Sequence, residues 1–191
     1  MRIYASEVGG SRGMSLPGTS TINPDWSFEI AGVSPGKRLF RMTGLPPTHV
    51  LKAVTVGGED VTDTATEFDG KGTITDVTLL LTERVTSILG EVTDDRGRQV
   101  QEYALVAFAA DPERWNPGSR FIGSARPDQN GRTSLSGLPP GDYLVVAVDY
   151  LERGQAEDQE FLTAMRAKAT AVPLAEGEAK SVNLKLVARE R

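Results

Sequence analysis

The sequence predicts an all-β fold of two tandem antiparallel β-sandwiches, with one short helix in the second. Short runs of alternating apolar residues dominate the chain, and Gly, Pro, Asn or Asp interrupts them about every ten residues. One strand–turn–strand pattern occurs twice, 105 positions apart, which indicates two domains of one fold. A single segment has its apolar residues at helical spacing.

The expected strands are the runs with the clearest alternation. In residues 77–82 and 181–187, Val or Leu occupies every second position, which places one apolar face inward. Because short strands are many and helical stretches few, antiparallel sheets are expected. The predicted strands are Ile3–Ser6, Ser27–Ala31, Arg38–Thr43, Val50–Val56, Ile74–Leu81, Ser87–Thr93, Tyr103–Ala109, Thr133–Ser136, Tyr143–Asp149, Ala169–Pro173 and Ser181–Val187.

The segment Glu157–Lys168 is expected to form the helix. Acidic residues stand in its first turn and basic residues in its last turn, which suits the helix dipole. Phe161, Leu162 and Met165 fall on one face at helical spacing. We expect this face to pack over one end of the second sandwich; a partner-binding helix is the alternative.

The repeated pattern is a strand, a turn of the form Gly–apolar–x–Pro–Gly and another strand. Trp26–Leu39 aligns without gaps on Gly131–Leu144. Proline fixes φ in the turn and glycine supplies a positive φ, so both flanking strands are expected to lie antiparallel. The two domains are expected at residues 1–84 and 85–191. The structural turn residues are Gly32, Pro35, Gly36, Gly137, Pro140 and Gly141.

The two copies differ at their starts. The second opens with a strand and a turn in Val85–Gln101, whereas the first begins at Ile3, which corresponds to the strand Ala104–Ala109. The first domain is therefore expected to lack one or two strands. Such a sandwich has an open sheet edge and a groove in its core, a site for pairing with another chain. Either the parent protein continues N-terminally and was cut here, or the edge receives a strand donated by another molecule.

Three segments together resemble the carboxypeptidase regulatory-like domain. They are the strand and turn Gly90–Arg98, the turn Asp128–Arg132 and the Gly-Leu-Pro-Pro-Gly-Asp-Tyr run Gly137–Tyr143. The resemblance covers Ser87–Tyr150 well and holds more weakly over residues 22–82.

This resemblance implies a transthyretin-like or prealbumin-like sandwich, an Ig-like fold of about seven strands. The motif is a fold signature, and such modules accompany peptidases, outer-membrane receptors and surface proteins as folding, spacing or binding units. The chain departs from the family pattern at Arg38, where Tyr is expected, and at Thr133, where an aromatic residue is usual. Both departures are expected to weaken the core locally.

Composition narrows the function classes. The net charge is −5 and both halves are mildly acidic, so neither has the basic stripe that duplex nucleic acid requires. The chain has no cysteine, no apolar run of the ~20 residues that span a bilayer, and no visible signal peptide. We expect an extracytoplasmic bacterial protein (cell surface, periplasm or secreted) of which this chain is a fragment, with no cofactor.

Few residues suggest chemistry. His49, the only histidine, lies in a loop entering a strand, and no nucleophile, phosphate-binding or metalloprotease motif is present, so no enzyme is expected. No metal site is expected either. Glu59, Asp60, Asp63 and Asp69 form a weak calcium candidate, with ordinary β-turns as the alternative.

A sugar-binding platform is the remaining candidate ligand site. Trp115 lies in a long polar loop, and Tyr150 and Phe121 are placed to join it, because flat rings stack on sugar faces. The alternative for Trp115 is an anchor that pins the loop to the sandwich. Trp26 is expected to pack in the core.

Three functions stay open at this point. A structural or protein-interaction module, assembling through an open sheet edge, is favoured. A carbohydrate-binding module would need an exposed Trp115 ring beside Tyr150. An accessory domain of a peptidase or outer-membrane receptor is the third. Partners are therefore expected to be protein, either self or the rest of the parent protein, or carbohydrate.

Overall fold

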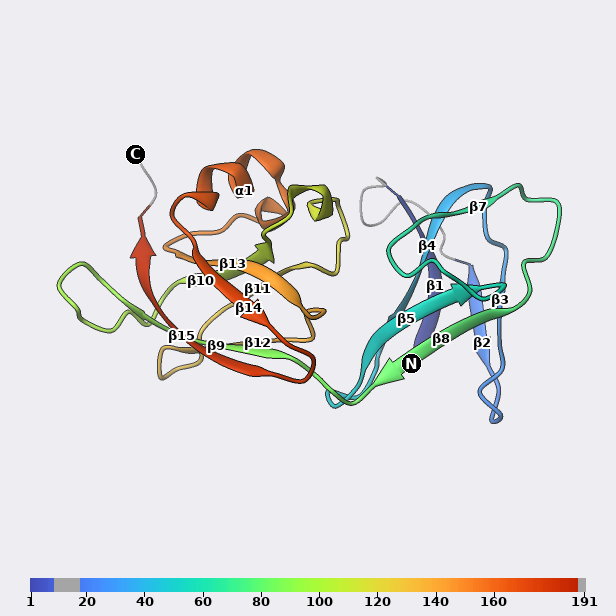
Figure 1. The fold of residues 1–191 in the computed structure, drawn as a ribbon, viewed down its shortest axis with the longest axis horizontal. Helices are drawn as coiled ribbons and strands as arrows, with labels where there is room; N and C mark the ends of the chain where they lie inside the picture. The colour runs from blue at the N-terminus through green and yellow to red at the C-terminus, as the bar shows by residue number, and fades with distance from the viewer. Residues whose placement is uncertain (9–17, 189–191) are drawn as a thin grey trace. The chain divides into compact units, whose positions relative to one another are not determined.

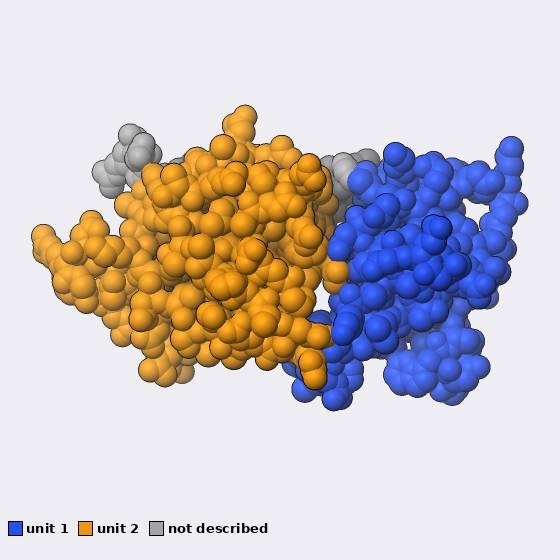
Figure 2. Space-filling view, in the orientation of Figure 1, with its two compact units in different colours: residues 1–83 blue, residues 84–191 orange. Residues whose placement is uncertain are grey.

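The computed structural model describes residues 1–8 and 18–188, and it confirms the all-β class. The chain divides into two compact units, Met1–Glu83 (unit 1) and Arg84–Arg191 (unit 2). Figure 1 shows the strands of both units, and Figure 2 colours unit 1 blue and unit 2 orange. Each unit is described by itself.

Unit 1 contains three antiparallel sheets, ordered β1-β4-β7, β2-β3 and β6-β5-β8. The predicted strands of this half are present. The short strands β2 and β7 were not predicted, whereas β6 forms the hairpin with β5 that the resemblance implied over Val56–Asp63. The bounds are β1 Arg2–Glu7, β2 Thr19–Ile22, β3 Phe28–Ala31, β4 Gly36–Thr43, β5 Val50–Val56, β6 Glu59–Asp60, β7 Thr66–Phe68 and β8 Val77–Thr82.

Unit 2 forms one seven-stranded sheet, ordered β11-β10-β13-β15-β9-β12, with β14 beside β13. Its strand β11 was not predicted. The bounds are β9 Ser87–Thr93, β10 Ala104–Ala109, β11 Ile122–Ala125, β12 Arg132–Ser136, β13 Gly141–Val148, β14 Thr170–Leu174 and β15 Ala179–Val187, with 3-10 turns η1 Pro112–Arg114 and η2 Gln155–Glu157 and helix α1 Gln159–Arg166.

The expectation of wholly antiparallel sheets is wrong in unit 2. Strand β15 runs parallel to β9 along its length and parallel to the end of β13. The reason is topological: β14 runs antiparallel to β13, and the chain then reverses once more into β15. Two reversals restore the direction of β13.

The strands that flank each Pro–Gly turn do not pair with each other, contrary to prediction. In unit 1, β3 pairs with β2, whereas β4 pairs with β1 and β7. In unit 2, β12 pairs with β9, whereas β13 pairs with β10, β14 and β15. Each turn therefore carries the chain between strands that are not neighbours. Gly32 and Gly137 both have a positive φ, 73° and 86°, which strains any residue with a Cβ.

Arg38 and Tyr143 tie this turn in the same way in the two units. The buried guanidinium of Arg38 donates from Nε to the Ser34 carbonyl at 3.2 Å and from Nη2 to the Pro35 carbonyl at 3.1 Å. The buried hydroxyl of Tyr143 donates to the Pro139 carbonyl at 2.7 Å. Arg38 therefore replaces the expected tyrosine as a donor; the local weakening expected at this position stays a prediction. That the two units share one fold also stays a prediction.

Thr133, the second departure from the family pattern, is also accommodated by hydrogen bonds. It is 2% exposed, and its hydroxyl donates to the Tyr103 hydroxyl at 2.6 Å. That phenol donates to the Gly131 carbonyl at 3.1 Å, and burial raises the pKa of Tyr103. A buried hydroxyl with a partner avoids the cost of desolvation without a hydrogen bond.

The predicted helix is present and packs on a sheet face rather than over one end of the sandwich. Asp158 caps α1 by accepting from the Phe161 N–H at 2.8 Å. Leu162 is fully buried against β10 and β13, where it joins Val106 and Val146. The opposite face of these strands carries the larger core of unit 2, which includes Ile88 of β9.

Candidate interaction groove

Unit 1 contains an open apolar groove of about 1170 Å³. Its floor is formed by apolar side chains of the β1-β4-β7 sheet, of which Ile3 and Phe40 are 4% and 3% exposed. One rim is the continuous stretch 28–33, which contains β3. The other rim is residues 76–79 with Leu81, at the start of and along β8. We call this feature the β3–β8 groove.

The inward side chains of both rims are only half-buried. Phe28 and Ile30 on β3, and Val77 and Leu79 on β8, alternate with exposed residues along their strands. Such residues are normally fully buried in a closed sandwich. Within residues 1–8 and 18–83, β3 pairs only with β2, and β8 pairs only with β5. Each rim is therefore the edge of a sheet, where backbone donors and acceptors are available to a further strand.

Trp26 lies at one end of this groove and is 72% exposed, which contradicts the prediction that it packs in the core. Its φ is 68°, in the left-handed region that a bulky residue rarely adopts. The turn is held by hydrogen bonds: Trp26 N–H donates to the Asn23 carbonyl at 3.0 Å, and Asn23 N–H donates to the Ser27 carbonyl at 2.8 Å. Asp25 accepts from the Ser27 hydroxyl at 2.7 Å, and this contact is the main cause of the lowered pKa of Asp25.

Two turns of unit 2 have the same backbone pattern with glycine at the fourth position. Gly97 and Gly131 have φ of 74° and 73°, and their N–H groups donate to the carbonyls of Asp94 and Asp128. Trp26 occupies the glycine position of this turn in unit 1. A tryptophan held in this conformation and left in solvent indicates a role other than packing. The sequence contained a signal for it, because the repeat aligns Trp26 on Gly131.

The expected sugar platform is not formed by its three residues. Trp115 is 3% exposed, its Nε1 donates to the Ala109 carbonyl at 2.7 Å, and its ring meets Phe108 edge-on with centroids 5.4 Å apart. It is the loop anchor, because an indole N–H that is buried needs an acceptor. Phe121 is 7% exposed, and the Arg114 guanidinium lies 4.2 Å from the centre of its ring. Tyr150, at 56% exposed, lacks the partner rings.

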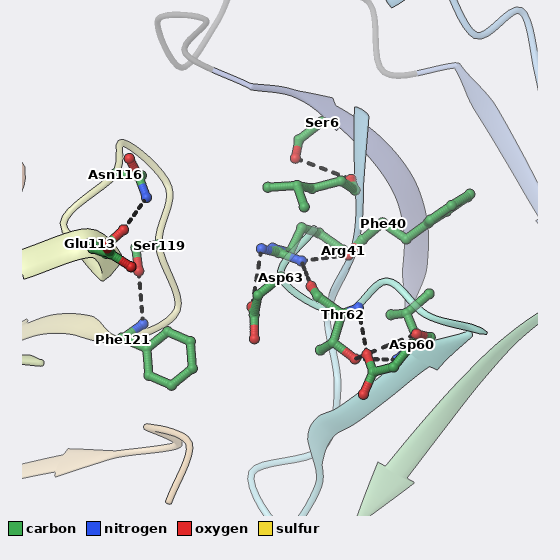
Figure 3. A network of polar contacts seen from close by, with 12 residues as sticks. Ser6, Phe40, Arg41, Asp60, Thr62, Asp63, Glu113, Asn116, Ser119 and Phe121 are labelled. Carbon is green, nitrogen blue, oxygen red and sulfur yellow. Dashed lines mark hydrogen bonds and ion pairs between the residues drawn. The ribbon is translucent and has the colours of Figure 1, made fainter. Parts of the chain in front are cut away.

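The carboxylates of the calcium candidate are used in local contacts. Asp60 accepts from the Thr62 N–H at 2.8 Å, and Asp63 lies 3.8 Å from Nη2 of Arg41 (Figure 3). Asp69 accepts from the Lys71 N–H at 2.8 Å, and Glu59 lies in β6. Within the described residues, no group of three metal-ligating side chains converges. The hydrogen bonds of Asp60 and Asp69 are ordinary for Asp in turns, so these contacts favour the β-turn alternative, and calcium binding stays a prediction.

His49 is partly exposed and lies just before β5. Its Nδ1 lies 3.0 Å from the Thr48 hydroxyl, and its Nε2 lies 3.4 Å from a Glu83 carboxylate oxygen. None of the described helices is both long and apolar enough to cross a bilayer.

Comparison with known proteins gives only distant likenesses. No family model and no curated protein matches the chain. A DUF3823 family protein from Parabacteroides merdae is 17% identical, with a TM-score of 0.33, over 53% of this chain and 45% of that one. A streptococcal ancillary pilin is 13% identical, with a TM-score of 0.35, over 83% and 46%. GBS52, the minor pilin of Streptococcus agalactiae, is 14% identical, with a TM-score of 0.30, over 66% and 59%.

The chain spans less than two thirds of each of these three proteins. TM-scores of this size support no inference about this chain. The β3–β8 groove itself is therefore the basis for a function.

Proposed function

We propose that this chain is a non-catalytic interaction module of an extracytoplasmic bacterial protein, and that unit 1 binds a partner polypeptide in the β3–β8 groove. The observation that carries the proposal is the combination of an apolar floor with two sheet edges as rims. A polypeptide satisfies both at once, because its backbone pairs with a sheet edge while its side chains enter the pockets.

The charge of the groove narrows the partner. Among the described residues, the charged side chains in its lining are all acidic: Glu29, Glu67, Asp69 and Asp76. They attract a partner with basic residues beside its apolar ones and disfavour an acidic partner.

The resemblance to carboxypeptidase regulatory-like domains supports the same proposal. Modules of that group act as spacing or binding units beside a working domain, so the partner is either another part of the parent protein or a different protein. The localisation at the cell surface or in the periplasm is part of this proposal.

Binding of extended peptides to the purified chain tests this function. The measurement is a titration with a peptide library of varied apolar and charge pattern, followed by methyl NMR of Ile, Leu and Val side chains. We expect the methyl signals of Ile30 and Leu79 to shift first. Ile30→Asp should abolish binding by placing a charge in the groove.

Leu80→Asp is the matched control. Leu80 is adjacent to Leu79 on β8, points to the other face and is 52% exposed, so this charge should leave binding unchanged. If no peptide of any pattern binds, or if the two variants behave alike, the proposed function is wrong.

A further inference from the structure

We infer that the β3–β8 groove accepts one extended strand, inserted antiparallel to β3 and parallel to β8, with a small residue at its centre and a basic residue beside it. The inference rests on the proposed function and specifies the partner. Its template is β9, the strand that fills the corresponding place in unit 2.

The sequences of the two units align around this place. A shift of 105 positions aligns β3 on β12 and β4 on β13, and it also aligns Val77, Leu79 and Leu81 of β8 on Val182, Leu184 and Leu186 of β15. The pairing of β1 with β4 agrees with that of β10 with β13, whereas unit 2 does not repeat the pairing of β3 with β2 and of β8 with β5. In unit 1, Ile3 of β1 is opposite Met42 of β4; in unit 2, Leu105 of β10 is opposite Ala147 of β13.

In unit 2, β9 lies between β12 and β15. It runs antiparallel to β12, with Ile88 opposite Leu135, and parallel to β15, with Val92 opposite Leu184. Its central residue, Gly90, is opposite Thr133 on one side and Val182 on the other. Strand β9 therefore joins the two edges whose equivalents in unit 1 are β3 and β8.

Apolar side chains next to β9 in unit 2 are more buried than the aligned side chains of unit 1. Leu135 and Leu184 are 9% and 5% exposed beside this strand. The aligned residues of unit 1, Ile30 and Leu79, are half-buried and line the groove. In the described part of unit 1, β3 pairs with β2, β8 pairs with β5, and no strand joins β3 to β8. One added strand would complete both sheets and cover these side chains.

The floor of the groove favours a small residue at the centre of the inserted strand. A Cβ at Gly90 would lie 2.5 Å from Cδ1 of Leu105, so a larger residue there would require the Leu105 side chain to move. Ile3 occupies the place of Leu105 in unit 1, and the larger Phe28 stands where Thr133 stands. These neighbours favour Gly at the centre of the inserted strand.

Two carboxylates favour a basic residue immediately before that glycine. In unit 2, Leu89 is opposite Ser134 of β12 and Ser181 of β15. The same shift of 105 positions aligns Glu29 of β3 with Ser134 and Asp76 with Ser181, although Asp76 lies just before β8 and has a φ of 55°. A Lys or Arg at the place of Leu89 would be opposite Glu29 and next to the turn that carries Asp76, whereas an acidic residue there would meet like charges. The inferred partner segment reads apolar–basic–Gly–x–apolar.

A peptide derived from β9 tests the inference on the unmodified chain. The probe has the sequence of Thr86–Asp94 with L89K, which gives the inferred pattern. We expect it to bind unit 1 and to slow amide hydrogen exchange along β3 and β8, because both edges gain hydrogen-bond partners. The same peptide with L89E, or with L89K and G90L, should bind about tenfold more weakly or not at all.

Changes in the protein provide the reciprocal test. The double variant Glu29→Lys and Asp76→Lys should reverse the preference, so that the L89E peptide binds better than the L89K peptide. Neither residue is buried, so the variant should fold, and far-UV circular dichroism checks that it does. Leu80→Asp again serves as the control that should leave both affinities unchanged.

The outcomes separate this inference from the proposed function. If other peptides bind the groove and respond to Ile30→Asp, but the L89K peptide does not bind or leaves exchange in β3 and β8 unchanged, the strand inference is wrong and the proposed function stands. If no peptide binds, both fail. Self-association that Ile30→Asp abolishes, without peptide binding, would assign the groove to a second copy of the chain and overturn both.

Discussion

Units 1 and 2 build the same corner and close their cores to different extents. Arg38 and Tyr143 fix equivalent turns by donating to carbonyls at the same place. Beside β9, however, Leu135 is 9% exposed, whereas Ile30 at the aligned position lines an open groove. The comparison teaches that turn chemistry and alternation suffice to form the strands, while closure of a sandwich depends on one further strand.

The largest expected effect comes from removing a side chain of that strand. Ile88 is fully buried on β9, so Ile88→Ala should leave a cavity and lower the free energy of unfolding of unit 2 by about 3 kcal/mol. Ile30→Ala truncates a side chain that is already half in water, and should cost unit 1 about 1 kcal/mol or less. Chemical denaturation followed by residue-resolved hydrogen exchange measures the free energy of unfolding of each unit. Equal losses for the two variants would contradict the claim that the core is closed in unit 2 and open in unit 1.

The corner residues should give the next largest effects, and similar ones in the two units. Tyr143→Phe leaves the buried Pro139 carbonyl without this donor and should cost unit 2 about 1–2 kcal/mol. Arg38→Met removes two such donors and should cost unit 1 about 2 kcal/mol. Arg38→Tyr is the sharper variant: if the corners are equivalent, thermal unfolding should show a smaller loss for it than for Arg38→Met.

Alternation predicted the long strands because each has one buried and one exposed face. It did not predict β2, β6, β7 and β11, which are two to four residues long. Nor did it predict that β15 runs parallel to β9, because strand direction depends on the whole path of the chain rather than on local pattern. The helix was predicted well, since its cap, its charges and its apolar face agree.

The candidate site was predicted in part. The unequal starts of the two copies led to the expectation of an open core in the first domain, and the groove lies in unit 1. The ring that sequence analysis chose for binding, Trp115, is buried, because its N–H reaches the Ala109 carbonyl. The exposed ring, Trp26, was assigned to the core. Its exposure follows from a positive φ, which the alignment with Gly131 implied and which hydrophobicity alone does not reveal.

Replacing Trp26 by glycine should stabilise unit 1 by about 1 kcal/mol, because glycine adopts a φ of 68° without strain. The matched change in unit 2, Gly131→Ala, should cost about the same amount, since its φ is 73° and the new Cβ would lie 3.0 Å from the Val100 carbonyl. Thermal unfolding measures both. If Trp26 contributes to binding, Trp26→Gly should also lower the affinity of unit 1 for the β9-derived peptide. If the variant were instead less stable than the original chain, the turn would depend on contacts of the indole ring.

The smallest expected effect is the response of the turns to acid. The pKa values of Asp94 and Asp128 are lowered, first by the backbone N–H groups of Arg98 and Arg132 that their carboxylates accept. A carboxyl group with a lowered folded pKa stabilises the fold above its unfolded pKa, and that contribution is lost as the pH falls through the folded value, here below about pH 4. Asp128 is exposed and Asp94 is partly exposed to solvent, so the loss is modest.

The matched variants separate the units in this test. The double variant Asp94→Asn and Asp128→Asn should flatten the acid decline of unit 2 only, and Asp25→Asn should flatten that of unit 1 only, because each carboxylate accepts hydrogen bonds within its own turn. Unfolding midpoints of each unit at pH 6 and pH 3, read by hydrogen exchange or NMR, measure the slopes. A variant in one unit could instead change the pH dependence of the unfolding midpoint equally in both units. The units would then unfold as one cooperative body, and the open groove of unit 1 would not give it a stability separate from that of unit 2.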